Sequence, residues 1–228
     1  MFSLIARLLR KEEGSSKEPS FKQPPDKKRL PKNLKVLGEK NVNKVVGNPR
    51  VHRAGKVTFQ GKGNTVFFGE NVLLKHVHIR FIGNNSTVHI GDNVSLNGDF
   101  FLKDNCSINI GSGSKFNNQK SKLFCGEHNT KISLGEGCLI ADAKIRTSDQ
   151  HAIIDNNTGE RTNYPEDVVI ENNVWIAEDV RIHKGAFIGK GTVVGARATV
   201  FGNLPANSLC VGTPAKAIKD NISWVDKV

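Results

Sequence analysis

The sequence lacks the features that define several other classes of protein. It has four cysteines, and no two of them show the Cys-x-x-Cys spacing of a zinc site or a redox motif. No apolar run is long enough to cross a bilayer as a helix. The short apolar stretch at the N-terminus is broken by Arg7, and no small-residue cleavage site follows it. A reduced, cytoplasmic protein is therefore the simplest expectation.

Aromatic residues are also scarce. They make up 7% of the 228 residues, with one Tyr and two Trp. The core must therefore be built mainly from aliphatic side chains. Glycine, with 22 residues, and asparagine are abundant, and both are turn residues. This composition predicts short strands joined by many turns.

The positive charge is concentrated near the N-terminus. Residues 1–36 carry ten Lys or Arg and four acids, a net of +6 that leaves +5 of the total +11 for the rest of the chain. Residues 12–36 are rich in Lys, Pro and Ser and indicate an extended linker. The moderately basic remainder suits an anionic substrate or cofactor, and we expect no nucleic-acid partner.

The first residues have the pattern of a short amphipathic helix. Phe2, Ile5, Ala6 and Leu9 fall at helical spacing, with basic residues on the other faces. Such a helix could touch an anionic membrane surface at its apolar side. The alternatives are a frayed terminus and a helix that packs on its own oligomer.

A six-residue repeat runs through the chain from about Val57 onward. Each step begins with an aliphatic residue, has a small or aliphatic residue at its fifth position, and carries polar residues or glycine between them. Earlier segments keep the pattern with slips near residues 80, 110 and 120, which predict bulges or short insertions. The clearest steps are IENNVW, IAEDVR, IHKGAF, IGKGTV and VGARAT, which begin at Ile170, Ile176, Ile182, Ile188 and Val194.

A period of six favours strands and turns over a helix. The fifth residue of one step and the first of the next are two apart, so they share one face of a strand. An amphipathic helix would instead repeat its apolar stripe every 3.6 residues. The pattern resembles the hexapeptide repeat of the left-handed β-helix acyltransferases, in which three steps close a triangular coil of about 18 residues.

The resemblance covers roughly residues 57–218. It implies an all-β, left-handed parallel β-helix with one long extruded loop and a basic N-terminal extension. We expect the extension and linker at residues 1–36, the β-helix at 37–215 with its loop at 146–167, and a C-terminal tail at 216–228. Cys106, Cys138 and Cys210 fall at the fifth, inward position, where Cys acts as a small core residue rather than a nucleophile.

The loop contains a candidate catalytic histidine. The segment RTSDQHAIIDNNTGERTNYPED interrupts the repeat between Ile145 and Val168, and long loops in compact domains tend to be functional. His151 lies near its start, and a neutral imidazole near pH 7 can take the proton of an attacking hydroxyl group. Taken alone, a single loop histidine is more simply a solvated side chain.

Two segments resemble the O-acetyltransferases that modify sialic acid polymers and other bacterial surface polysaccharides. They are SDQH at residues 148–151 and VWIA at residues 174–177. The resemblance implies that His151 is the general base. It also implies that Trp175, at an outward sixth position, lines the same site. Asp149 has two interpretations, as an orienting partner of His151 or as a local turn residue.

The end of the repeat points to the acetyl donor. VGTPAKAI, residues 211–218, resembles the G-x-P-A-K/R-x-I ending of hexapeptide enzymes that use acetyl-CoA. The resemblance implies that Lys216 and Lys219 reach the nucleotide phosphates. Ala177 and Gly195 are separated by the length of one expected coil, so we expect them to stack at one edge, with Ala196 beside them. Small residues there would leave room for the pantetheine arm.

We expect no bound metal ion, and we expect the chain to form a symmetric oligomer. His76 and His78 alternate on one apparent strand, but no third ligand is evident, and the carbonic anhydrases of this fold need three histidines. The resemblance also implies a homotrimer with its sites between adjacent subunits.

The sequence thus predicts an O-acetyltransferase that transfers acetyl from acetyl-CoA to a sugar hydroxyl of a capsule, sialic acid polymer or O-antigen by direct, His-assisted attack. One alternative is acetylation of a small sugar or a nucleotide-linked amino sugar. The non-enzymatic alternative is a β-helix scaffold or binding module, which predicts no affinity for CoA.

Overall fold

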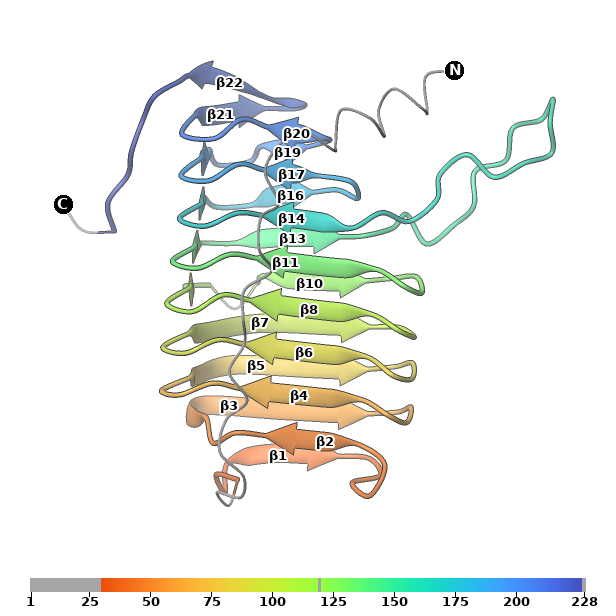
Figure 1. The fold of residues 1–228 in the computed structure, drawn as a ribbon, viewed down its shortest axis with the longest axis vertical. Coiled ribbons are helices and arrows are strands. Elements are labelled where there is room, and N and C mark those ends of the chain that lie inside the picture. Colours follow the sequence, from red (N-terminus) through yellow and green to blue (C-terminus); the bar gives the residue numbers. More distant parts are fainter. Residues whose placement is uncertain (1–29, 119, 227–228) are drawn as a thin grey trace, which may run out of the picture.

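The computed structural model describes residues 30–118 and 120–226, and their regular secondary structure is entirely β-strand. These residues form the left-handed parallel β-helix that the repeats predict, with coils stacked along one axis (Figure 1). In the same residues, no helix is long and apolar enough to cross a membrane. The expected helix near Phe2–Leu9 lies outside the described residues.

Three flat faces make up the prism. The first face contains β9 (Lys115–Phe116), β12 (Leu139–Ile140), β15 (Trp175–Ile176), β18 (Val193–Val194) and β21 (Leu209–Gly212). The second contains β1 (Leu34–Leu37), β10 (Lys122–Cys125), β13 (Ala143–Arg146), β16 (Val180–Ile182) and β19 (Thr199–Val200). The third contains β2 (Lys44–Val46), β4 (Thr65–Phe68), β6 (Thr87–Ile90), β8 (Ser107–Ile110), β11 (Lys131–Leu134), β14 (Val168–Ile170), β17 (Phe187–Ile188) and β20 (Asn203–Leu204).

The N-terminal coils are longer than the three-step repeat predicts. On the third face, Val66 pairs with Val88, whereas after the loop Ile170 pairs with Ile188, so an early coil contains more residues than a late one. The expected coil length is therefore wrong for the early coils. Their strands β3 (Arg50–Phe59), β5 (Leu73–Phe81) and β7 (Ser95–Leu102) continue from the first face to the second, and the register shifts at this corner mark the extra residues.

Inward side chains fill the prism with aliphatic residues. The first and fifth positions of the clear repeats, such as Ile176 and Val180, are fully buried. All four cysteines are free and buried, which confirms the core role predicted for Cys106, Cys138 and Cys210. At the corners, residues such as Asn71, Asn93 and Asn173 adopt positive φ values near 55°, a conformation that Asn tolerates better than most residues. The abundance of Asn thus has a local cause.

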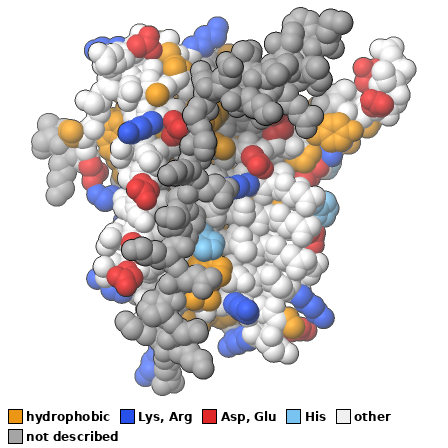
Figure 2. All heavy atoms as spheres, in the orientation of Figure 1, with side chains coloured by type: hydrophobic (Ala, Val, Ile, Leu, Met, Phe, Trp, Pro, Cys, Tyr) orange, Lys and Arg blue, Asp and Glu red, His pale blue; other side chains and the backbone are white. Residues whose placement is uncertain are grey.

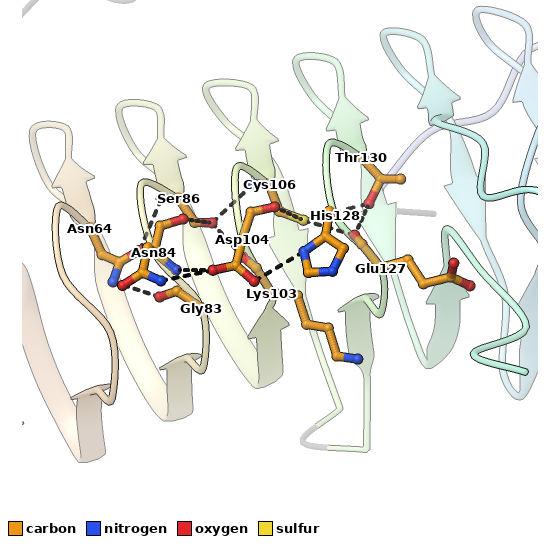
Figure 3. Close-up of polar contacts among 10 residues, drawn as sticks. All are labelled: Asn64, Gly83, Asn84, Ser86, Lys103, Asp104, Cys106, Glu127, His128 and Thr130. Atoms are coloured by element: carbon orange, nitrogen blue, oxygen red, sulfur yellow. Dashed lines mark hydrogen bonds and ion pairs between the residues drawn. The ribbon is translucent and has the colours of Figure 1, made fainter.

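A ladder of buried polar groups joins the coils at the corner between the second and third faces (Figure 3). Asn64 Oδ1 accepts a hydrogen bond from the Ser86 amide, and Ser86 Oγ accepts one from the Cys106 amide, both at 2.9 Å. The ladder ends where Thr130 Oγ1 meets Thr147 Oγ1 at 2.8 Å. Because buried polar groups need partners, these bonds fix each coil against the next. Thr147 is also the first residue after β13, so the ladder fixes the start of the loop.

The last strand closes the C-terminal end. β22 (Ala215–Lys219) turns back and pairs antiparallel with β21, so Lys216–Lys219 belong to the sheet rather than to the expected tail. At the other end, β1 begins at Leu34, slightly before the expected boundary at residue 37, because this segment pairs with β3.

Candidate functional site

The long loop leaves the prism between the second and third faces. It connects Arg146, at the end of β13, to Val168, at the start of β14, and extends as an arm (Figure 1). The Glu166 amide donates to the Thr147 carbonyl at 2.9 Å and closes the base of the arm. Figure 2 shows hydrophobic side chains along this arm. The most exposed large ones are Ile153 (59%), Ile154 (49%) and Tyr164 (61%).

An ion pair ties the arm to the prism. The two terminal guanidinium nitrogens of Arg161, Nη1 and Nη2, donate to the Glu127 carboxylate at 2.7 and 2.8 Å. The side chains are only 22% and 17% exposed, and Arg161 lowers the pKa of Glu127, so the carboxylate stays charged. Bidentate pairs of this kind fix orientation as well as position. No sequence motif marks this pair, because its members are far apart in the sequence.

Asn163 organises the segment that contains His151. Its buried amide nitrogen donates to Asp149 Oδ2 at 2.9 Å and to the His151 carbonyl at 2.8 Å. Its amide oxygen accepts a hydrogen bond from the Ile153 amide at 2.7 Å. One side chain thereby holds the backbone at His151 and Ile153 and the Asp149 carboxylate. Sequence reasoning missed it, because nothing distinguishes Asn163 from the other asparagines of the loop.

Asp149 takes part in this arrangement without bonding to the His151 ring. Lys184 Nζ lies 2.7 Å from Asp149 Oδ2, and this contact lowers the pKa of the carboxyl group. Asp149 is therefore neither a direct partner of the His151 ring nor only a local turn residue. Asp149 instead acts on the His151 backbone through Asn163. Next to Lys184, the His183 ring stacks on Phe201 at 4.3 Å, and burial lowers the pKa of His183.

The His151 side chain itself is accessible. It is exposed, and no described residue forms a hydrogen bond with its ring. Its backbone is held while its imidazole remains available to a substrate. This combination suits a general base, because proton transfer requires direct contact with the reacting hydroxyl group.

Replacing Asn163 with alanine is expected to lower kcat about 10–100-fold, because the His151 backbone would lose its anchor and small misplacements of a catalytic group are costly. The KM for acetyl-CoA should change less than about twofold, because the expected coenzyme residues lie elsewhere. Steady-state acetyl transfer assays separate the two parameters. The matched control is Asn156→Ala, in the same loop but exposed and without such bonds. An unchanged kcat for Asn163→Ala would contradict the positioning role.

Trp175 projects from a different face. It lies on β15 of the first face, between Leu139 and Val193, and its ring is 6.0 Å from that of Trp224. Trp224 is held by a hydrogen bond from its Nε1 to the Asn173 carbonyl, at 2.6 Å. His151 instead follows β13 on the second face. Within one chain the fold therefore does not bring the two predicted site residues to the same face.

Three of the predicted coenzyme residues, Ala177, Gly195 and Ala196, share one corner. Ile176 pairs with Val194, so Ala177 and Gly195 follow side by side one coil apart, which confirms the predicted stacking. A Cβ on Gly195 would lie 2.7 Å from Val211 Cγ1, so this close coil contact favours glycine. Ala196 is exposed beside them. The small side chains of these residues leave room for an extended chain beside the corner between the first and second faces.

A cavity of about 710 Å³ occupies the same corner nearer the N-terminus. It is lined by His52, Arg53, Lys75, His76, Asn97, Asn117, Asn118, Ala141 and Glu178. Glu178 directly follows Ala177, so the cavity adjoins the predicted coenzyme corner. Its size lies within the range of ligand pockets.

Lys216 and Lys219 are exposed on β22, at the C-terminal end of the prism. Lys216 pairs with Val211 and Lys219 with Leu209, so the two cations lie toward opposite ends of β21. Among residues 30–118 and 120–226, no group of three His, Cys, Asp or Glu side chains could hold a metal ion. Of the two histidines considered as ligands, His76 lines the cavity and His78 Nε2 lies 2.9 Å from Thr58 Oγ1.

Known proteins with a similar sequence or fold are acetyltransferases. No protein-family model matches the chain. It is 32% identical over 198 residues to the polysialic acid O-acetyltransferase of Neisseria meningitidis, covering 85% of this chain and 91% of that protein. The crystal structure of the polysialic acid O-acetyltransferase OatWY superposes with a TM-score of 0.72 at 29% identity, covering 85% and 89% of the two chains. The polySia-specific acetyltransferase NeuO gives a TM-score of 0.69 at 27% identity, covering 87% and 89%.

Proposed function

The chain belongs to the family of the polysialic acid O-acetyltransferases, and on this premise we propose that it transfers acetyl from acetyl-CoA to a hydroxyl group of a bacterial surface polysaccharide. The observation that carries the proposal is His151, an exposed imidazole on a backbone held by Asn163. A scaffold protein would have no need of an accessible base on a fixed loop. We further propose that the protein works in the cytoplasm and that its N-terminal segment contacts the inner membrane.

The reaction requires a single displacement. The sugar hydroxyl oxygen attacks the thioester carbonyl carbon while a ring nitrogen of His151 takes the hydroxyl proton. The C–S bond then breaks, and the proton passes from His151 to the departing CoA thiolate. We assign the pantetheine arm to the corner of Ala177, Gly195 and Ala196, and the phosphates to Lys216 and Lys219. Backbone amides are the expected donors to the oxyanion.

We propose that the working unit is a homotrimer. Two features support it: His151 and Trp175 lie on different faces, and the arm exposes Ile153, Ile154 and Tyr164. Exposed apolar side chains gathered on one segment indicate a protein contact. In a cyclic trimer, the arm of one chain would deliver His151 to the coenzyme corner and Trp175 of its neighbour. Such a site is incomplete in a single chain.

Defined acceptors test the proposed function. Incubation with acetyl-CoA should acetylate a bacterial polysaccharide, such as polysialic acid, detected by NMR of the product and by release of CoA. The size of the acceptor separates the alternatives. Transfer only to free monosaccharides or nucleotide-linked amino sugars would support the small-acceptor enzyme. Failure to bind CoA at all would support a scaffold or binding module.

A further inference from the structure

The outer surface of the second face carries two columns of register-paired side chains, which we call the cationic face. Neighbouring members of each column are directly paired between adjacent coils. The first column is Lys35, Lys56, His78, Asp99, Lys122, Lys144 and Arg181. The second is Thr58, Arg80, Phe101, Phe124 and Arg146.

Charge is distributed unevenly over the prism. The two columns contain seven Lys or Arg side chains and one acid, Asp99. The eight strands of the third face carry only two cationic side chains, Lys44 and Lys131. The second face is therefore much more cationic than the third.

The like charges in the first column destabilise the sheet, and packing of the core does not require them. Lys122 pairs with Lys144, and Lys144 pairs with Arg181, so three cations lie directly opposite one another on adjacent strands. Strands are about 4.8 Å apart, and like charges at directly opposite positions destabilise a sheet. Within the described part of the chain, one acid outside the columns pairs with these three cations, namely Asp179 with Lys144 at 3.4 Å. An anionic ligand would relieve the repulsion.

The second column fixes an arginine beside aromatic rings. The Arg80 guanidinium lies over the Phe101 ring, 6.0 Å from its centroid, and Phe101 stacks on Phe124 at 4.4 Å. No residue of the described chain accepts a hydrogen bond from the Arg80 side chain, and its Nε is buried without a partner. A planar guanidinium group that stacks on a ring keeps its terminal N–H donors available for a carboxylate.

The cationic face leads to the proposed active site. Lys144 and Arg146 lie on β13, which ends where the His151 arm begins. β3 and β5 also pass from the basic cavity at His52, Arg53 and Lys75 directly onto this face. From Lys35 to Arg181 the first column crosses seven coils, a length of about 30 Å at about 4.8 Å for each coil.

We propose that the cationic face is the docking surface for the acceptor, a carboxylate-bearing, anionic polysaccharide strand that lies along the prism axis. This inference rests on the proposed function and adds the surface that holds the acceptor. A single-file row of cations matches a linear polyanion better than a membrane plane. A second copy that presented the same face would place cations against cations.

Matched charge reversals test the docking surface. The variant Lys122→Glu/Lys144→Glu changes the cationic face, and Lys44→Glu/Lys190→Glu makes the same charge change at exposed sites elsewhere. Binding of polysialic acid is measured at low ionic strength without acetyl-CoA, with neutral dextran and phosphatidylglycerol vesicles as further probes. We expect the Kd for polysialic acid to rise at least about tenfold in the first variant and less than about threefold in the control. Salt should weaken binding to the unchanged protein.

Three outcomes would overturn the proposal. They are an equal loss of binding in both variants, loss of vesicle binding with polysialic acid binding retained, and a changed oligomeric state of the first variant. The proposed function fails separately. If the protein binds polysialic acid through this face but acetylates no glycan, the docking surface is supported and the proposed acetyl transfer is contradicted. If it acetylates a neutral polysaccharide and binds no polyanion, the proposed acetyl transfer is supported and the docking surface is contradicted.

Discussion

Replacing His151 with alanine is expected to lower turnover by about 10²–10⁴-fold, the usual contribution of a positioned acid–base group. The fold should survive, because His151 lies in the loop outside the repeat and no described residue bonds to its ring. The Asn163 amide bonds to the His151 backbone carbonyl, which alanine retains. CoA affinity by calorimetry and the unfolding temperature should therefore match the unchanged protein while initial rates collapse.

Cysteine variants provide the control for this experiment. A hydrogen bond with Cys125 lowers the pKa of Cys106 to about 6, a value typical of a reactive thiol. Cys106 is nevertheless only 2% exposed and belongs to the polar ladder of the core. Cys106→Ser and Cys138→Ser should mainly cost stability and should retain transfer. A fully active His151→Ala protein beside a folded but inactive cysteine variant would instead indicate a covalent thioester route.

The fold could be predicted because its cause is local. A six-residue period in hydrophobicity dictates strand, turn and stacking at every step, and the same rule places Cys138 and Ile176 in the core. The coil length of the N-terminal half could not be predicted in this way. Whether three steps or longer strands close a coil depends on how β3, β5 and β7 bend around a corner, and the register shifts there leave only weak signals in the sequence.

The residues of the candidate site also fall into those that the sequence could predict and those that it could not. A motif made His151 the candidate base, which stays a prediction, whereas the stacking of Ala177 and Gly195 that their spacing predicted is confirmed. Asn163 and the Glu127–Arg161 pair could not be found, because they act between distant positions and are of common residue types. The cationic face also cannot be recognised in the sequence. Its cations are spaced by whole coils and align only after the chain has closed on itself.

Combining two defective chains in one trimer should restore activity. In a site shared between neighbours, His151→Ala removes the base and Trp175→Ala removes part of the opposite wall. In every trimer that contains both variants, cyclic order leaves one of the three sites with His151 from one chain and Trp175 from the next. Co-expression with two different affinity tags isolates such trimers. A mixed trimer should therefore turn over at about one-third of the unchanged rate, far above the His151→Ala protein.

The measurement that tests the account most directly is the acetyl transfer rate of these purified mixed trimers on an anionic polysaccharide. The account predicts about one-third of the unchanged turnover, because one complete two-chain site survives in each trimer. If each site lay within one chain, every chain would carry a defect, and the mixed trimer could not exceed the average of its parents. A rate at or below that average, or a protein that stays monomeric and active, would contradict the shared histidine-driven site.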